Sequence, residues 1–387
     1  MNAEMKKRIY LDNAATTAVD IDILESAIKY FSIDYGNPSG IYKESRVAKN
    51  AIDIARDAVA KLINSSPDEI YFSGGGSESD NWALRALLEK SEKKHIITSK
   101  IEHQAILNTC KYLEFKGYNI TYLDVDNKGF VDLDMLEKVI NEDTLLVSIM
   151  SANNEVGTIQ DIKRACDIAH KNGAYFHTDA VQSIGKMDID VQDIGVDMLS
   201  ISAHKIHAFK GVGALYVSKN INISPLIYGG EQESGKRAGT QNVPGIVSLG
   251  LACEKVNKNY EQRQYIRKLR DYFITQVQNN ISDVIVTGDM EQRLINNVHF
   301  CFKDIDSNLL ITLLDMEGTS CSIGSACMSG SIEKSHVLSV MKIDDNYISG
   351  NVRFSLSKNN TTEEIDKVVQ QLIKIVKKLL LLILMTL

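Results

Sequence analysis

Proline is scarce in this sequence, and long apolar runs are missing. Only 4 of the 387 residues are proline, which argues against long extended linkers. The longest apolar run follows Lys378 and is far shorter than the roughly 20 residues that a membrane-spanning helix needs. We interpret that run as the end of an amphipathic helix that begins near Thr362 and packs on the body or a partner, with peripheral membrane contact as a minor alternative. The polar start MNAEMKKRIY is not expected to act as a signal peptide.

Positive charge and cysteine pairs are also lacking. Lysine and arginine number 43 against 50 aspartates and glutamates, and the formal net charge of −7 disfavours a nucleic-acid or anionic-membrane surface. The six cysteines form no C-x-x-C pair and show no regular spacing. We therefore expect a reduced, cytoplasmic protein with mostly free thiols, at least four of them buried as small hydrophobic side chains. The cysteines are Cys110, Cys166, Cys253, Cys301, Cys321 and Cys327.

What the sequence does contain is an alternation of short β-rich runs with helical patterns. Helical patterns follow at 103–115, 133–140 and 162–171. This alternation predicts a mostly parallel sheet with helices on both faces. Ligands bind beyond the C-terminal ends of the strands in such sheets. The β-rich runs lie at 69–72, 95–100, 119–126, 144–150, 174–180, 197–202 and 213–217.

The last third of the chain has a different character. A long helical pattern runs from about Val243 to about Val277, and short strands such as NVHFCF and NVRFSL follow it. The composition after residue 260 indicates a second, smaller domain. We predict a large domain over 14–258 and a small domain built from 1–13 and 259–387.

Two glycine-rich stretches are candidate anion-binding loops. SGGGSESDN, at 73–81, follows a β-rich run and opens a helical pattern, so its N–H groups and the helix dipole favour an anion. A plain strand-to-helix turn explains it equally well. GEQESGKR, at 230–237, imitates a Walker loop, but Arg237 stands where Ser or Thr must hold magnesium, so we reject a P-loop. An exposed loop that offers Lys236, Arg237 and Thr240 to an anion is the alternative.

Two charged side chains stand at the ends of neighbouring β-rich runs. Asp179 follows AYFHT, where a buried carboxylate needs a cation or a donor, although a helix cap is the ordinary alternative. Lys205 follows DMLSIS and, taken alone, is most simply a solvated lysine. His204 and His207 have a metal-like spacing, but no cysteine or carboxylate set joins them, so no metal site is predicted.

The combination of these features favours one cofactor. Pyridoxal phosphate requires an anion cradle, an acid and a lysine, and all three fall at strand ends of one predicted sheet. Its phosphate needs backbone and hydroxyl donors, and its pyridine nitrogen needs a carboxylate. Its aldehyde needs a lysine amine for a Schiff base.

From residue 10 to the last helix, the chain resembles the cysteine desulfurases, within the fold-type I, class V aminotransferase group. Each motif alone is weak, but their ordered sum is specific. The motifs are YLDNAATT, YGNPSG, SGGGSESDN, EHQAIL, NNEVGTIQ, HTDAVQS, SAHK, RAGTQNVPG, GSACMSGS and NVRFSLS. The resemblance implies a fold-type I pyridoxal phosphate enzyme of α/β class. Its large, mostly parallel domain would have a seven-stranded sheet, its C-terminal α/β domain would be smaller, and it would be a homodimer.

The resemblance also implies roles by position. Lys205 would form the Schiff base, Asp179 would pair with the pyridine nitrogen, and Gln182 would bond the ring hydroxyl. His103 would stack on the ring and act with Lys205 and Cys327 as a catalytic group. Asn154 and Arg353 would grip the substrate carboxylate, Arg353 by a two-pronged hydrogen bond. The phosphate ligands would be Gly76, Ser77, Ser202, His204 and the partner's Thr240.

Cys327 matches the nucleophilic cysteine of the family. The implied reaction takes sulfur from L-cysteine: Lys205 removes the α-proton, the Cys327 thiolate attacks the substrate sulfur, and alanine leaves. The resulting persulfide would pass to an acceptor, an iron–sulfur scaffold or a tRNA-thiolating enzyme. The long form of the loop resembles the nitrogen-fixation and housekeeping type. Cys321 matches no catalytic position and is expected to be structural, entering the loop from a strand.

A few positions depart from the family pattern. Ala208–Phe209 replace Gly-Pro after the lysine, and Ile323 replaces a serine in the loop. None removes a group that performs chemistry, so they bear on rate and acceptor choice. Two other interpretations stay open. A selenocysteine lyase or another class V enzyme would keep its main activity without Cys327, and a non-catalytic sulfur-transfer scaffold would be colourless.

Overall fold

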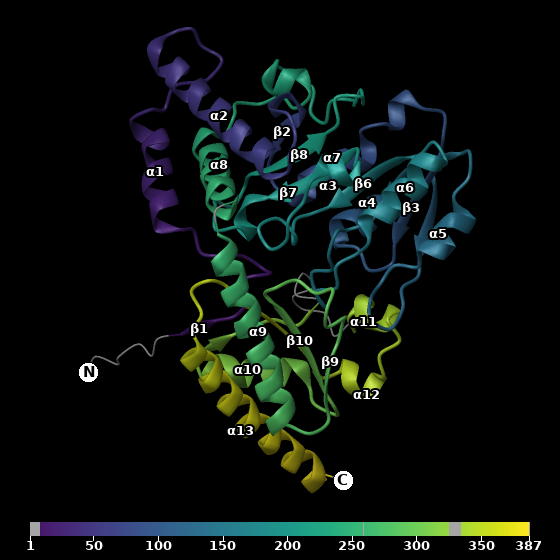
Figure 1. Cartoon of the computed structure of the whole chain (residues 1–387), viewed down its shortest axis with the longest axis vertical. Helices are drawn as coiled ribbons and strands as arrows, with labels where there is room; N and C mark the ends of the chain where they lie inside the picture. Colours follow the sequence, from purple (N-terminus) through teal and green to yellow (C-terminus); the bar gives the residue numbers. More distant parts are fainter. Residues whose placement is uncertain (1–7, 258, 325–333, 387) are drawn as a thin grey trace.

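The computed structural model describes residues 8–257, 259–324 and 334–386. Figure 1 shows an upper part built on a large sheet and a lower part built on a small one. Helices α8 (Val243–Asn257) and α9 (Tyr260–Asn280) run from the upper part to the lower part. The helical pattern expected over 243–277 is therefore two helices.

The large sheet has seven strands in the order β2-β8-β7-β6-β5-β3-β4. All the neighbouring pairs from β7 to β4 are parallel, and only β8 runs against the rest. The connection from β7 to β8 has no α-helix to carry the chain across, so β8 returns antiparallel beside β7. The predicted mostly parallel, seven-stranded α/β fold is confirmed. The strands are β2 (Ile70–Ser73), β3 (His95–Ser99), β4 (Asn119–Leu123), β5 (Thr144–Ser148), β6 (Tyr175–Asp179), β7 (Met198–Ser202) and β8 (Gly213–Val217).

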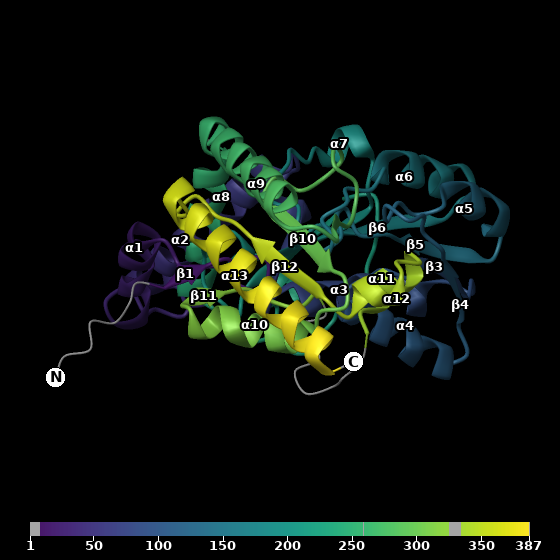
Figure 2. The same ribbon diagram turned by 90° about the horizontal axis from the view of Figure 1, so that it is seen from below.

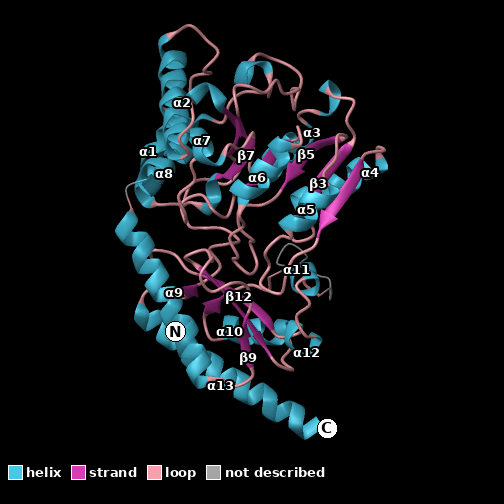
Figure 3. Ribbon diagram, turned by 45° about the vertical axis from the view of Figure 1, so that its right-hand side comes forward, coloured by secondary structure: helices cyan, strands magenta, loops and turns pink. Residues whose placement is uncertain are grey.

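Helices cover both faces of this sheet, as Figure 3 shows. Successive strand residues point to opposite faces, so Ile96 packs in one cluster and Ile97 in the other. The first cluster lies under α3 (Gly76–Arg85) and α4 (Gln104–Phe115). The second lies under α2 (Lys43–Leu62), α5 (Leu133–Val139), α6 (Ile162–Lys171) and α8. The other elements there are α1 (Ile21–Ser32), α7 (Val191–Ile194) and the 3-10 turns at Pro67–Glu69, Leu88–Lys90, Ala203–Lys205 and Gln232–Gly235.

The lower part has its own core. Phe273 packs edge to face on Phe300 and Phe354, with ring centroids 5.5 and 5.1 Å apart. Leu11 is fully buried in the same cluster, so the start of the described chain joins this core. Its sheets are β12-β10-β9 and β1-β11. The elements are β1 (Ile9–Tyr10), β9 (Val284–Val286), β10 (Asn297–Phe302), α10 (Ser307–Met316), β11 (Thr319–Ser320), α11 (His336–Val340), α12 (Asp345–Ile348), β12 (Asn351–Ser355) and α13 (Thr362–Thr386). The domain boundaries at 13/14 and 258/259 stay a prediction.

The last helix begins at Thr362, as the sequence predicts. Figure 2 shows α13 lying across the small sheet beside α9, and Ile365, Val368 and Leu372 are buried there. Among the described helices, including α13, none combines the length and apolarity needed to cross a bilayer. Four of the six cysteines are buried as expected, and Cys321 directly follows β11.

Gly250 is required where α8 crosses α2. A Cβ at this position would lie 2.5 Å from the Cα of Ala55, which is backbone and cannot move aside. A glycine-to-alanine change inside a helix ordinarily stabilises it by about 1 kcal/mol. Here we expect Gly250→Ala to lower the free energy of unfolding by about 1–3 kcal/mol through overpacking, as urea denaturation would measure.

Gly245→Ala, in the same helix, is the control. Its nearest neighbour is the side chain of Asn242, which can move aside by giving up its hydrogen bond with the Gly245 amide, so the loss of stability should be smaller than for a clash with backbone. Equal effects of the two variants would contradict the packing argument.

Candidate active site

The glycines after β2 form a cradle at the N-terminus of α3. Gly75 has φ 144°, in the left-handed region that favours glycine, and precedes the helix as its N-cap. A Cβ on Gly76 would lie 2.7 Å from Val181 Cγ2, so only glycine fits there. The cradle borders a cavity of about 450 Å³ that is also lined by Ser77, Ser202 and His204. Backbone N–H groups at a helix N-terminus attract an anion, and the cradle brings four predicted phosphate ligands together.

Asp179 ends β6 as a buried carboxylate, 7% exposed. The amide of Val181 donates to its Oδ1 at 2.9 Å. Burial raises the pKa of Asp179, while His103, the Val181 amide and the charge of Lys205 lower it. The carboxylate therefore needs a cationic partner to remain ionised.

Lys205 sits in the 3-10 turn that follows β7, and its Nζ is directed back toward the start of the chain. It donates to the carbonyl oxygens of Ala14 and Ala15, both at 2.7 Å. Gln182 Nε2 donates to the same Ala14 oxygen at 2.9 Å. The chain before α1 thus joins the lysine and the glutamine that the sequence placed in one site.

The turn after Lys205 accommodates the departure from Gly-Pro. Ala208 is fully buried, and the amide of Phe209 donates to Ser248 Oγ at 3.1 Å. Proline has no such amide, so the phenylalanine adds a hydrogen bond to α8. His204 Nδ1 contacts Thr16 Oγ1 at 3.1 Å, and burial with nearby lysine charge lowers the pKa of His204 to about 4.

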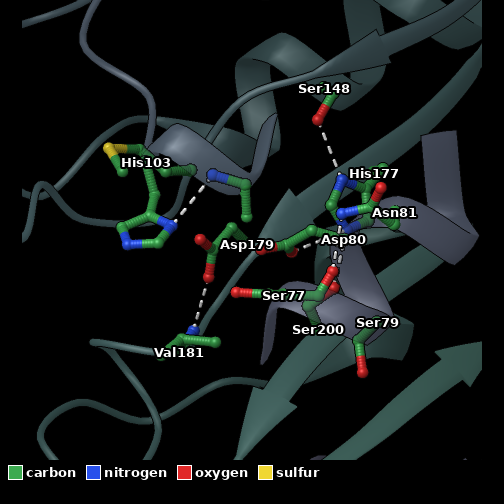
Figure 4. Close-up of polar contacts among 12 residues, drawn as sticks. Ser77, Ser79, Asp80, Asn81, His103, Ser148, His177, Asp179, Val181 and Ser200 are labelled. Atoms are coloured by element: carbon green, nitrogen blue, oxygen red, sulfur yellow. Dashed lines mark hydrogen bonds and ion pairs between the residues drawn. The ribbon is translucent and has the colours of Figure 1, made fainter. Parts of the chain in front are cut away.

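His103 caps α4 and lies beside Asp179 in Figure 4. Its Nδ1 accepts a hydrogen bond from the amide of Ala105 at 3.1 Å, which fixes the ring at the helix N-terminus. His103 and Asn154 both line a second cavity of about 520 Å³ that opens beside Gly324. The predicted ring-stacking histidine and the carboxylate-binding asparagine are thus neighbours.

Arg353 reaches the site from the small sheet. It is 3% exposed; its Nη1 donates to the carbonyl of Asn154 and its Nη2 to Asp12 Oδ1, both at 3.0 Å. Its Nε is buried without a hydrogen-bond partner. A buried guanidinium donor left unpaired is costly, so it is a place for an acceptor such as a carboxylate.

Two predicted residues, the partner's Thr240 and Cys327, stay predictions. Thr240 is exposed in the turn before α8 and is not among the residues that line the cavity beside Gly75. Cys327 lies outside the described residues. Lys236 and Arg237, proposed for an anion, are engaged within the chain: Lys236 Nζ donates to Ile223 O, and Arg237 pairs with Glu78.

Sequence reasoning missed a polar network under the sheet. Figure 4 shows His177 between Ser148 and Ser200, with Asp80 directed toward them from α3. The His177 Nδ1 and Nε2 atoms lie 2.8 and 3.0 Å from the two serine oxygens. Burial lowers the pKa of His177 to about 3, so the ring is neutral. Burial and the charge of Asp179 raise the pKa of Asp80 well above its ordinary value.

Comparisons with known proteins agree with this geometry. Residues 9–368 match the family model for class V aminotransferases. The chain is 45% identical to the cysteine desulfurase IscS of Dictyoglomus turgidum, over 97% of this chain and 96% of that protein. It is 46% identical to the IscS of Methanosarcina thermophila, over 96% and 93%. A solved NifS-like protein superposes with a TM-score of 0.91 at 40% identity, over 96% of this chain and 100% of its own. The structure of SspA in complex with cysteine superposes with a TM-score of 0.81 at 36% identity, over 91% and 100%.

The chain therefore belongs to the class V aminotransferase family and, within it, to the cysteine desulfurases, which depend on pyridoxal phosphate. The residues present fit that cofactor. A cradle that excludes a side chain at Gly76 has room for a phosphate, and the buried carboxylate of Asp179 lacks a contacting lysine or arginine among its described hydrogen bonds and ion pairs.

Glu102, next to His103, is a buried carboxyl group whose pKa reports how far water is excluded from this part of the chain. It is fully buried, and burial raises its pKa to about 8, although Ser99 and the amide of Met150 donate to it. Between pH 4.5 and 8 the folded protein keeps this proton and the unfolded chain releases it, so stability falls as the pH rises.

We expect Glu102→Gln to remove this dependence. The melting temperature of the variant minus that of the unsubstituted protein should therefore increase from pH 5 to pH 8. The corresponding difference in the free energy of unfolding should grow by at most about 1.4 kcal/mol per pH unit. Scanning calorimetry measures it, and a difference that stays constant with pH would contradict the raised pKa.

Proposed function

We propose that this cysteine desulfurase takes sulfur from L-cysteine and carries it as a persulfide on Cys327, leaving L-alanine. The observation that supports this best is that Lys205 lies close enough to both Asp179 and Asp12 to act on their charges, and that Asp12 pairs with Arg353 from the small sheet. Asp179 would pair with the ring nitrogen, Lys205 would supply the amine and Arg353 would bind a carboxylate. Together these three roles suit an amino-acid substrate.

Bound pyridoxal phosphate supplies an aldehyde for the amine and an electron-withdrawing ring that stabilises charge at the substrate α-carbon. We infer that Lys205 holds the aldehyde and, once released, moves the α-proton. Asp179 would keep the ring nitrogen protonated, Gln182 would bond the ring hydroxyl and His103 would stack on the ring. The phosphate ligands would be Gly76, Ser77, Ser202, His204 and the partner's Thr240.

Arg353 would orient the substrate. Its Nε lacks a partner among the described residues, and its guanidinium is already held by Asp12 and the Asn154 carbonyl. A receptor fixed in advance binds a carboxylate with little loss of side-chain entropy. The substrate α-carbon would thereby stay within reach of Lys205.

Cys327 would accept the sulfur. Its thiolate forms a bond to the sulfur of L-cysteine while the Cβ–S bond breaks, and the electron pair stays with the carbon skeleton that leaves as alanine. The persulfide sulfur would then pass to an acceptor protein, an iron–sulfur scaffold or a tRNA-thiolating enzyme, in the cytoplasm.

A homodimer is the assembly that this proposal requires, because the phosphate site would take Thr240 from a second copy. An exposed apolar surface on the described chain supports it. Ile28 and Phe31 on α1 are 54% and 63% exposed, and Ile33, Tyr35 and Ile41 in the following loop are 71%, 70% and 91% exposed. Such a large exposed patch is typical of a protein interface.

The catalytic assignment is tested by two variants. Lys205→Ala should abolish alanine release from L-cysteine, since the base is gone. Cys327→Ser should keep the yellow cofactor absorbance but lose persulfide and sulfide, by roughly a thousandfold or more, since it lacks the nucleophile. Mass spectrometry after exposure to L-cysteine should find one added sulfur on the peptide that holds Cys327. Substantial sulfide release by the serine variant would refute this nucleophile.

The proposed homodimer can be tested by placing a charge in the exposed apolar surface. Phe31→Glu should shift the protein toward monomer in sedimentation velocity and weaken cofactor retention, because burying a carboxylate in an apolar interface is costly. Phe115→Glu is the matched control, since Phe115 is 84% exposed on α4, away from the patch. A monomer before any substitution, or equal effects of the two variants, would exclude the proposed interface.

A further inference from the structure

Glu155 is a second buried carboxylate beside the proposed site, and the reaction gives it no role. It is 2% exposed, in the loop after β5. Asn153 fixes its backbone: the amide of Glu155 donates to Asn153 Oδ1 at 2.9 Å. Asn297 Nδ2, on β10, donates to the Glu155 carbonyl oxygen at 2.9 Å. The main chain at Glu155 is thus held between the large sheet and the small one.

The Glu155 carboxylate binds Ser335. The Ser335 hydroxyl donates to Glu155 Oε2 at 2.5 Å. Ser335 is also the N-cap of α11, where its Oγ accepts from the amide of Leu338 at 3.2 Å. A hydrogen bond to a carboxylate is stronger than one between neutral groups. It ties the start of α11 to the loop that supplies Asn154.

Gly324 lies against the same carboxylate. A Cβ at 324 would overlap Glu155 Oε2 and lie 3.2 Å from His299 Nε2. The φ angle of Gly324 is not positive, so the glycine is required here for space rather than for backbone freedom. Its amide donates to Asn351 Oδ1 at 3.2 Å.

The surroundings of Glu155 make this contact consequential. Burial raises the pKa of Glu155, and the charges of His336, Arg353 and His103 lower it. A buried carboxylate keeps a fixed position only while its donors stay in place. Ser335 is its side-chain donor among the described residues, and it comes from the chain just beyond 325–333.

We propose that Glu155 is a positioning residue that clamps Gly324 and Ser335, the residues flanking the part of the chain that carries Cys327. The inference rests on the proposed function, because only a nucleophile at 327 gives the clamp a purpose. Fixing both ends of a chain segment reduces the conformations open to it and raises the local concentration of the thiol at the site.

The test uses the full-length holoenzyme with Glu155→Ala, Ser335→Ala and the double variant. We expect kcat for alanine release to fall about tenfold in each, because misplacing a reacting group by about 1 Å can cost a hundredfold. The rate of Cys327 alkylation by iodoacetamide without L-cysteine should change by at least about threefold in the same variants, because its ends are no longer held. The double variant should be no worse than the worse single one, since both remove one contact.

Two measurements separate positioning from damage to the fold. The cofactor absorbance and the KM for L-cysteine should stay unchanged in Ser335→Ala, since neither ring ligands nor Arg353 are touched. Ser339→Ala is the matched control, because it removes a hydroxyl from the same short helix that bonds the Ser335 carbonyl and not Glu155. It should keep both the alkylation rate and kcat.

The results that would overturn the clamp differ from those that would overturn the proposed reaction. Wild-type alkylation and kcat in Ser335→Ala would overturn the clamp even if Cys327 is the nucleophile. Equal changes in Ser339→Ala would overturn it as well. If Glu155→Ala does not fold, Ser335→Ala decides the question, because it removes the same hydrogen bond from the other side. The proposed nucleophile is judged separately, by persulfide on Cys327 in the unsubstituted enzyme.

Discussion

A carboxylate withdrawn from water at the end of a central strand is the constraint on which the site depends. Asp179 is 7% exposed, and its burial opposes ionisation unless cationic groups face it. Because β6 lies in the middle of a parallel sheet, such a group comes from another strand end, and the charge of Lys205, after the neighbouring strand β7, acts on Asp179. In the proposed function, the protonated pyridine ring is a further cation beside Asp179. The position of Asp179 at a strand end therefore determines where the proposed chemistry can take place.

Asp80, in the polar network around His177, is a second buried carboxyl group close to Asp179. Two buried carboxyl groups close together do not both ionise readily. The pKa of Asp80 is raised well above its ordinary value: Ser200 offers it a hydrogen bond, and the nearby neutral ring of His177 supplies no positive charge. Burial and the charge of Asp179 therefore both favour the protonated form of Asp80.

The sequence was sufficient for the sheet because each strand is a local pattern. Runs such as HIITS and MLSIS are apolar enough to be buried on both faces, and Asp179 and Lys205 could be found because they directly follow such runs. Asp80, Glu102 and Glu155 could not be found in this way. Each looks like an ordinary polar residue at the start of a helix or in a loop, and its burial depends on elements far away in the chain. The break between α8 and α9 had no proline or glycine to announce it.

The position of Arg353 shows that the register of β12 against β10 is strictly determined. In the β10–β12 ladder Arg353 is opposite His299, while Val352 and Phe354 belong to the core on the other face. Side chains alternate along a strand, so a slip of one residue would turn the guanidinium into the phenylalanine core and a phenylalanine toward Asp12. The β12 register is therefore fixed twice, by aromatic packing on one side and by the ion pair of Arg353 with Asp12 on the other. The proposed substrate receptor is therefore as firmly placed as the core behind it. For that reason the position of Arg353 is set by the packing of β12, although its guanidinium contacts Asn154 in the large-sheet part of the chain.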